Sequence, residues 1–215
     1  MPKTITAQGK AMRQVAPDTV TVRLDLSGVA QTYEEAIGLS ASKTEKLRSC
    51  VKEAGMDPEE LKTGTFRVYP HTRGEHDEKG IWREVFDGYG YEHSLAVTMP
   101  LEQLRLGEML RAFSGSGTDA AFSLEYSLRD AQAVQDALLE EAVRDALHRI
   151  GVLAKAAGLG KTTVLEIRHG AAAEVYAERR MEMITMAKGA DFDAVRVEPE
   201  AVRMRDEVTV IAAAD

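Results

Sequence analysis

The sequence predicts an α/β fold of the α+β type: a mixed, largely antiparallel sheet built from successive strand–helix–strand units, with helices packed on one face. Three observations predict it. Apolar residues alternate with polar ones near the start of the chain, they recur at every third or fourth position in longer segments, and glycines or prolines separate these segments. With 215 residues and 44% hydrophobic content, the chain can bury a sizeable core.

Two strands open the chain. Residues 4–9 and 20–26 place apolar side chains at every second position, as half-buried antiparallel strands require. Between them, Pro17 presets φ for a tight turn and Asp18 can bond to its own backbone. We therefore expect two antiparallel strands joined by a β-turn.

A helix follows these strands. Thr32 and Glu35 have the spacing of a capping box, in which each side chain bonds to the other residue's backbone amide at a helix start. Gly55 is a typical residue just after a helix end. The expected apolar face consists of Ile37, Thr44, Leu47, Val51 and Ala54.

The middle of the chain predicts further alternation of strands and helices. Residues 65–69 form an expected strand that Pro70 ends, and residues 82–99 contain a long strand. A shorter helix is expected over residues 101–113 and a strand over residues 121–128.

The longest predicted helix covers residues 131–157 and is rich in alanine. Strands are expected after it at residues 162–168 and at residues 207–213. The expected buried stripe of the helix consists of Leu139, Val143, Leu147, Ile150 and Leu153.

We expect one domain over residues 1–215, with strand–helix–strand sub-units at about residues 1–70 and 82–169. A polar loop or hairpin tip is expected at residues 71–80, and a long excursion at residues 170–200. The units are expected to share strands and to recur at residues 20–68, 95–128 and 124–167.

Composition excludes some classes of partner. The formal net charge of −8 disfavours nucleic acid, because a protein that binds the phosphate backbone needs a basic surface. No apolar run approaches the roughly 20 residues that span a bilayer. The sequence after Met1 has no export signal, so a cytoplasmic location is expected; the alternative is a periplasmic or exported protein whose leader was removed.

Cys50 is expected to be a small buried residue.

Candidate metal ligands are confined to one segment. His71, His76 and Asp77 are the weak candidates, but they lack the helical or cysteine-paired spacing of metal sites. We therefore interpret the segment as a solvated loop and expect no metal, no cofactor and no catalytic residue. The alternative is a small-ligand-binding or metal-binding protein, or an enzyme, that uses His71 and His76.

The excursion at residues 170–200 contains a group of thioether and aliphatic side chains, which adapt well to irregular partners. They form either an interface between copies of the chain or a strand packed on the chain's own core. The interface candidates are Met181, Met183, Ile184 and Met186.

In their order along the chain, these segments resemble the SIMPL-domain family. The resemblance covers almost the whole chain except residues 71–80 and 170–200. It is carried by residues 5–9, the turn at residues 16–18 with its following strand, residues 55–69, Gly90 and Tyr91 with residues 95–101, and residues 130–167.

The resemblance implies an α/β fold that assembles into ring-like or channel-like homo-oligomers, with no established catalytic residues. It also implies a link to the bacterial envelope and to stress tolerance. The sequence therefore predicts a non-enzymatic, self-assembling protein whose partner is a further copy of itself. A third hypothesis is a chaperone-like protein that exposes apolar patches.

Overall fold

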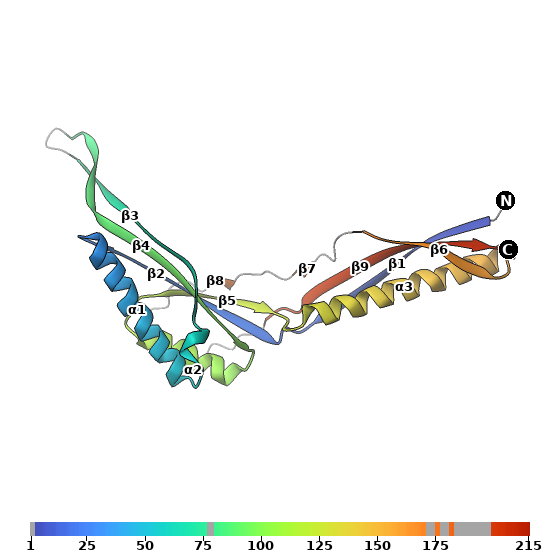
Figure 1. The fold of residues 1–215 in the computed structure, drawn as a ribbon, viewed down its shortest axis with the longest axis horizontal. Coiled ribbons are helices and arrows are strands. Elements are labelled where there is room, and N and C mark those ends of the chain that lie inside the picture. Colours follow the sequence, from blue (N-terminus) through green and yellow to red (C-terminus); the bar gives the residue numbers. More distant parts are fainter. Residues whose placement is uncertain (1–2, 77–79, 171–174, 177–180, 183–198) are drawn as a thin grey trace. The chain divides into compact units, whose positions relative to one another are not determined.

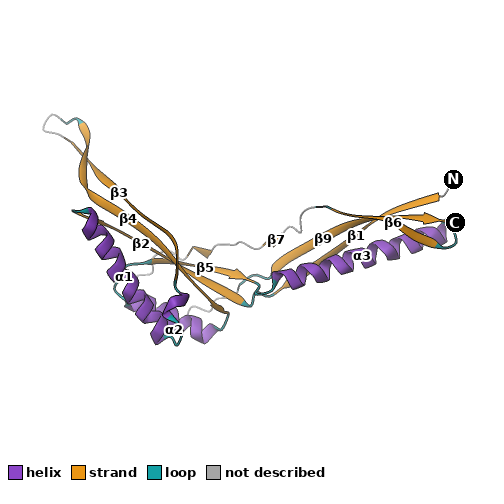
Figure 2. Ribbon diagram, in the orientation of Figure 1, coloured by secondary structure: helices purple, strands orange, loops and turns teal. Residues whose placement is uncertain are grey.

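The computed structural model describes residues 3–76, 80–170, 175–176, 181–182 and 199–215. The described elements are long strands, three α-helices and shorter segments between them (Figures 1 and 2). They are β1 (Lys3–Val15), β2 (Thr19–Ala30), α1 (Tyr33–Glu53), a 3-10 turn (Pro58–Glu60), β3 (Lys62–His76), β4 (Trp82–Pro100), α2 (Gln103–Gly115), β5 (Ala121–Ser127), α3 (Ala131–Ala156), β6 (Thr162–His169), β7 (Val175–Tyr176), β8 (Met181–Glu182) and β9 (Val202–Ala214).

The chain forms two compact units that interleave along the sequence. Unit 1 consists of residues 1–18, 127–178 and 199–215, and unit 2 of residues 19–126 and 179–198. Both are α/β, and the strand pairs of known register are antiparallel. The two units do not coincide with the predicted sub-units at residues 1–70 and 82–169, because the first and last strands of the chain pair with each other.

Unit 1 is a sheet covered by one helix. Its strand order is β1-β9-β6, and β1 pairs with β9 from Lys3 opposite Ala214 to Val15 opposite Val202. Every second residue of β9 is buried, as expected for a strand with one covered face. Those of them that pack with α3 into one apolar cluster are Val202, Met204, Val208, Val210 and Ala212. Figure 1 shows α3 running along β1 and β9.

The buried face of α3 differs from the predicted stripe. Ile150 of that stripe is buried as predicted, and Leu139 and Val143 pack partly buried against the core, but Leu147 and Leu153 are exposed. The other buried residues of the helix are Leu138, Ala142, Ala146 and Ala154. The reason is close packing against β1: a Cβ on Gly9 would lie 2.8 Å from the Ala146 Cβ. Small side chains are needed where two backbones approach so closely, so alanines occupy the core side of the helix.

The turn at residues 16–18 does not join a hairpin. β2 pairs with β4 and not with β1, so the predicted pairing of the first two strands is wrong. Asp18 instead donates its N–H to the Ser127 carbonyl oxygen at 3.2 Å and accepts the Arg129 N–H at 2.7 Å. These two contacts tie the segment after β1 to the segment before α3, both of which belong to unit 1.

Unit 2 has the strand order β3-β4-β2-β5-β8, and the core of its sheet packs against α1 and α2. The alternate residues Val20, Val22, Leu24 and Leu26 of β2 are buried in this core. The predicted capping box is confirmed, with Thr32 and Glu35 bonding reciprocally at the start of α1. The third predicted strand–helix–strand unit, residues 124–167, is wrong, because β5 lies in the sheet of unit 2 and α3 in unit 1.

β3 and β4 extend beyond the rest of their sheet as a two-stranded ribbon. β2 pairs with β4 only as far as Tyr89, while β3 and β4 continue to His76 opposite Trp82. The predicted end of the strand at Pro70 is therefore wrong, and residues 71–76 are paired strand instead of loop. The alternative prediction of a hairpin agrees with the antiparallel pairing of these two consecutive strands. The pairing register shifts between Pro70 and Thr72, and such an irregularity accommodates a residue without an N–H.

Candidate interaction surfaces

The two candidate histidines lie in β3 but do not form one site. The ring of His71 has its Nδ1 atom 3.7 Å from Asp87 Oδ2, whereas the His76 ring packs edge-on against Trp82. Five residues of extended strand separate them by roughly 16 Å. Ligands of one metal ion each lie about 2 Å from it, so the two rings cannot share an ion. Asp77 lies outside the described residues.

No metal-binding cluster emerges elsewhere in the part of the chain that the structure describes. Within it, no group of three or more histidine, cysteine or acidic side chains is placed to hold an ion. Of the interface candidates in the excursion, Met181 opens the short strand β8, which pairs with β5 at Leu124. Met183, Ile184 and Met186 lie outside the described residues, so their role stays a prediction.

A serine and a histidine that are far apart in the sequence lie within hydrogen-bond distance in unit 2, and the sequence analysis did not predict this contact. Ser40 Oγ of α1 lies 2.9 Å from His93 Nδ1 of β4, and Thr63 Oγ1 of β3 lies 3.1 Å from His93 Nε2. Ser40 is buried, and desolvation lowers the pKa of His93. Because both ring nitrogens contact hydroxyl groups, a neutral imidazole suits this network, which ties α1 to the sheet.

The β3–β4 ribbon, residues 72–76 and 82–86, has two different faces. Directly opposed residues share a face, so Phe86, Trp82 and His76 lie on one side and Arg73, Val85 and Glu75 on the other. The Trp82 ring packs over Gly74, where a Cβ would lie 2.7 Å from its Cε2 atom. Even so, Trp82 is 60% exposed and Phe86 is 56% exposed.

Sequence reasoning missed this aromatic face, although a signal for it was present. Trp82, Glu84 and Phe86 stand at every second position, so they share one side of any strand. The polar composition of the neighbouring residues 71–80 predicts a loop, and a loop would give residues 82–86 no paired strand to define a face. Exposed aromatic side chains gathered on one face are typical of protein-interaction surfaces.

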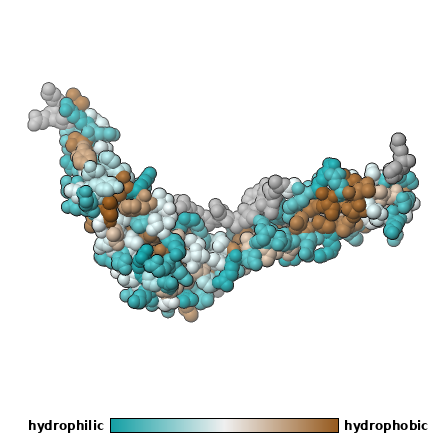
Figure 3. Space-filling model, viewed as in Figure 1, coloured by the Kyte–Doolittle hydropathy of each residue, from teal (hydrophilic) through white to brown (hydrophobic). Residues whose placement is uncertain are grey.

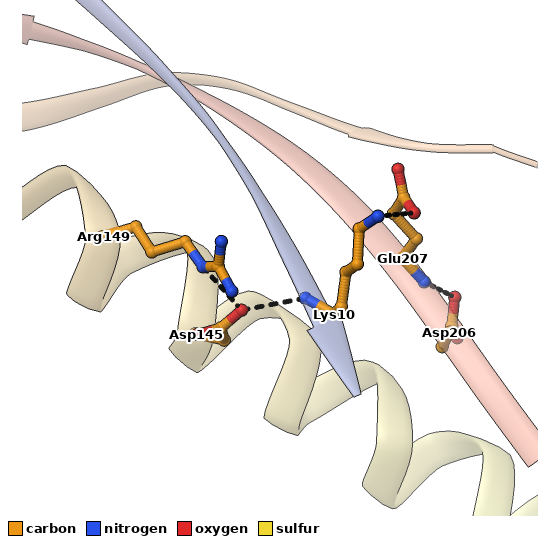
Figure 4. Close-up of polar contacts among 5 residues, drawn as sticks. All are labelled: Lys10, Asp145, Arg149, Asp206 and Glu207. Atoms are coloured by element: carbon orange, nitrogen blue, oxygen red, sulfur yellow. Dashed lines mark hydrogen bonds and ion pairs between the residues drawn. The ribbon is translucent and has the colours of Figure 1, made fainter. Parts of the chain in front are cut away.

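The two outer strands of the sheet in unit 1 differ. At β1, the Lys10 N–H donates to Asp145 Oδ2 of α3 at 3.0 Å, and Arg149 Nε donates to the same oxygen at 2.9 Å (Figure 4). The Lys10 hydrogen bond is the main reason why the pKa of Asp145 is lowered. Arg13 of β1 also pairs with Glu141 of α3. Side chains of α3 therefore bind one backbone donor and one side chain of this outer strand.

Next to this edge, polar contacts hold the central strand. Lys10 Nζ lies 3.2 Å from Glu207 Oε2 of β9 (Figure 4). The buried carboxylate of Asp206 accepts the Glu207 N–H at 2.7 Å, and His169 Nε2 at the end of β6 lies 2.8 Å from the same Asp206 oxygen. β6 is thus tied to β9 at one end, while its own side chains remain exposed.

Comparison with known proteins identifies the family of this chain. A family model, SIMPL, a protein of unknown function (DUF541), matches residues 5–212, and so spans both units. The chain belongs to the SIMPL family. The resemblance carried by its ordered segments is thereby confirmed, and so is the α/β fold that it implied.

This SIMPL chain is also similar to two curated proteins, each named 26 kDa periplasmic immunogenic protein. One is from Brucella melitensis biotype 1 and the other from Brucella abortus strain S19. Each is 26% identical over 166 residues, which is 77% of this chain and 66% of the relative. The match therefore spans slightly less than two thirds of the relatives' length.

None of the helices that the structure describes has the length and apolar character needed to cross a membrane.

Proposed function

We propose that this SIMPL protein is a non-enzymatic protein that assembles with copies of itself into a ring-like or channel-like homo-oligomer. The observation that supports this most directly is the aromatic face of the β3–β4 ribbon. A two-stranded ribbon is marginally stable alone in water, and Trp82 and Phe86 lie exposed on this one. Burial of these rings against another copy would stabilise both the ribbon and the assembly.

We further propose that the assembly works in the bacterial periplasm. The two curated relatives are named as periplasmic proteins, and this supports the predicted alternative of a chain that loses a leader. The cytoplasmic location expected from the residues after Met1 stays the competing prediction. Fractionation of cells that express the native gene, with periplasmic and cytoplasmic markers, distinguishes the two.

Light scattering of the untagged protein tests self-assembly. We expect a discrete oligomer for the wild type and a lower mass for Trp82→Glu combined with Phe86→Glu. Val85→Glu is the control, because it places a glutamate on the opposite face of the same ribbon. Circular dichroism checks that each variant folds.

A deletion of residues 171–191 tests the predicted excursion as an alternative interface. Loss of assembly in this deletion, with Trp82→Glu and Phe86→Glu behaving as wild type, would move the interface from the ribbon to the excursion. A wild type that is monomeric at every concentration would contradict self-assembly. Metal analysis and ligand screening of the whole protein would then test the alternative of a ligand-binding protein or an enzyme.

A further inference from the structure

β6 is an outer strand whose side chains are exposed. Among the strands that the structure describes, it pairs only with β9, on one side. Val164, Leu165 and Ile167 are 44%, 59% and 51% exposed. An outer strand with apolar side chains readily accepts a further strand, because its outward N–H and C=O groups lack partners in the sheet.

The exposure of β6 follows from the position of α3. Val164 lies opposite Ala212 and Ile167 opposite Val210, and these two residues of β9 belong to the cluster that α3 covers. Val164 and Ile167 therefore lie on the covered face of the sheet, yet remain in contact with solvent. Figure 3 shows hydrophobic side chains gathered over the part of unit 1 in which β6 and α3 lie.

At the opposite edge of the same sheet, side chains of α3 contact β1. Asp145 accepts the N–H of Lys10, so this donor cannot bond to an added strand, and the pair of Arg13 with Glu141 crosses the same edge. At these residues an added strand therefore finds β1 partly obstructed, whereas among the described residues no such contact is present along the outer side of β6.

We propose that the partner is β6 of a second copy of this chain, paired antiparallel about a two-fold axis at Ile167. In this register Ile167 faces its own equivalent, and Glu166 faces Arg168 of the second copy in both directions. The arrangement uses the residues after the irregularity between Val164 and Glu166, where the strand is regular. The sheets of two copies of unit 1 become one continuous sheet.

Charge complementarity selects a second copy over an unrelated strand. Glu166 and Arg168 stand symmetrically about Ile167, so the segment matches itself when reversed. Both charged residues lie on the sheet face away from α3, since they are opposite Ile211 and Thr209. Within one chain they already pair, with Arg168 Nε 2.6 Å from Glu166 Oε1. The dimer would convert two such pairs into a cluster of four alternating charges.

Covalent linkage tests the position of the axis. In a Cys50→Ala background, which removes the natural thiol, Ile167→Cys places two thiols next to each other across the axis. Mild oxidation then joins them in a disulfide, with the oxidant taking up two electrons and the thiols releasing two protons. Met12→Cys, on the exposed side of β1, is the matched control. We expect covalent dimer for Ile167→Cys well above the Met12→Cys level, with the reduced protein keeping its wild-type mass.

Charge reversal tests the register. Glu166→Arg and Arg168→Glu each create two like-charge contacts, and we expect each to raise the dissociation constant roughly fivefold to thirtyfold. The double reversal restores opposite charges across the axis and should return the affinity toward the wild-type value. The masses are measured by sedimentation at several protein concentrations.

This inference rests on the proposed self-assembly, but the two fail in different ways. An oligomeric wild type with no excess linkage at residue 167, and with unchanged affinity in the single reversals, would overturn the β6 pairing alone. A wild type that is monomeric at every concentration would overturn both.

Discussion

Gly9 of β1 lies so close to Ala146 of α3 that a Cβ on the glycine would stand 2.8 Å from the alanine Cβ and still closer to the Ala142 carbonyl oxygen. Atoms of the helix backbone cannot move aside as a flexible side chain can. This contact fixes the distance between α3 and its sheet, and it explains why α3 buries alanines along the face that meets β1.

Gly9→Ala should therefore destabilise unit 1. We expect a loss of roughly 1–3 kcal/mol in the free energy of unfolding, from overpacking. Gly151→Ala is the control, since a Cβ there meets nothing within 4 Å. Replacing a glycine inside a helix should stabilise the protein by about 0.5–1 kcal/mol. Urea unfolding measures both, and an equal response to the two substitutions would contradict the close packing.

The buried face of α3 gives a second prediction. Ile150→Ala removes a buried side chain and should cost about 2–5 kcal/mol, whereas Leu147→Ala, at an exposed site in the same helix, should cost about 1 kcal/mol or less. Thermal and urea unfolding of the two variants provide the measurement. A larger loss for Leu147→Ala would favour the face predicted from the sequence.

His93 gives unit 2 a pH dependence. Burial lowers its pKa in the folded state below the ordinary histidine value of about 6.5, so the unfolded chain binds a proton at a higher pH than the folded one. The stability that this creates is fully present above pH 6.5 and is lost as the pH falls through the lowered pKa. We expect the midpoint of thermal unfolding to drop between pH 7 and pH 5.

His93→Gln is the control for this dependence, because glutamine keeps a donor and an acceptor but does not titrate in this range. The drop in the unfolding midpoint between pH 7 and pH 5 should be smaller in the variant. The same slope in both proteins would exclude His93 as its source.

Cys50 should be unreactive in the folded protein. Its side chain is buried, its Sγ atom lies 3.4 Å from the Ala112 carbonyl oxygen, and burial raises the pKa of the thiol. Burial limits access to the sulfur, and the raised pKa reduces the fraction of thiolate, which is the reactive form. We expect slow reaction with a thiol reagent in buffer and rapid reaction in denaturant. Rapid labelling of the native protein would show that α1 opens readily.

The sequence predicted best where local chemistry decides the structure. The capping box of Thr32 and Glu35 and the alternation of β2 depend on neighbouring residues, and both are confirmed. The α3 stripe was predicted from its largest apolar residues, but the close approach at Gly9 reverses that preference in favour of alanine. Contacts between distant segments cannot be read from spacing alone.

The two candidate interaction surfaces also differ in how far local sequence patterns predict them. The alternation in residues 82–86 is enough to predict the aromatic face of the β3–β4 ribbon. The length of the ribbon is not predictable in this way, because the pairing continues past Pro70 only through a register shift. The exposure of β6 depends on where α3 lies over the sheet, which is a tertiary property. The single-domain expectation for residues 1–215 stays a prediction, and so does the role of Met183, Ile184 and Met186.

The pairing of β1 with β9 has a consequence for the order in which the chain folds during synthesis. The ribosome makes β1 early and β9 late, so β1 has no β9 to pair with until almost all of the residues between them have been translated. Residues 19–126 of unit 2 can meanwhile pair and pack with one another. Unit 1 is therefore expected to form last, and slowly, since pairing distant segments requires closure of a long loop.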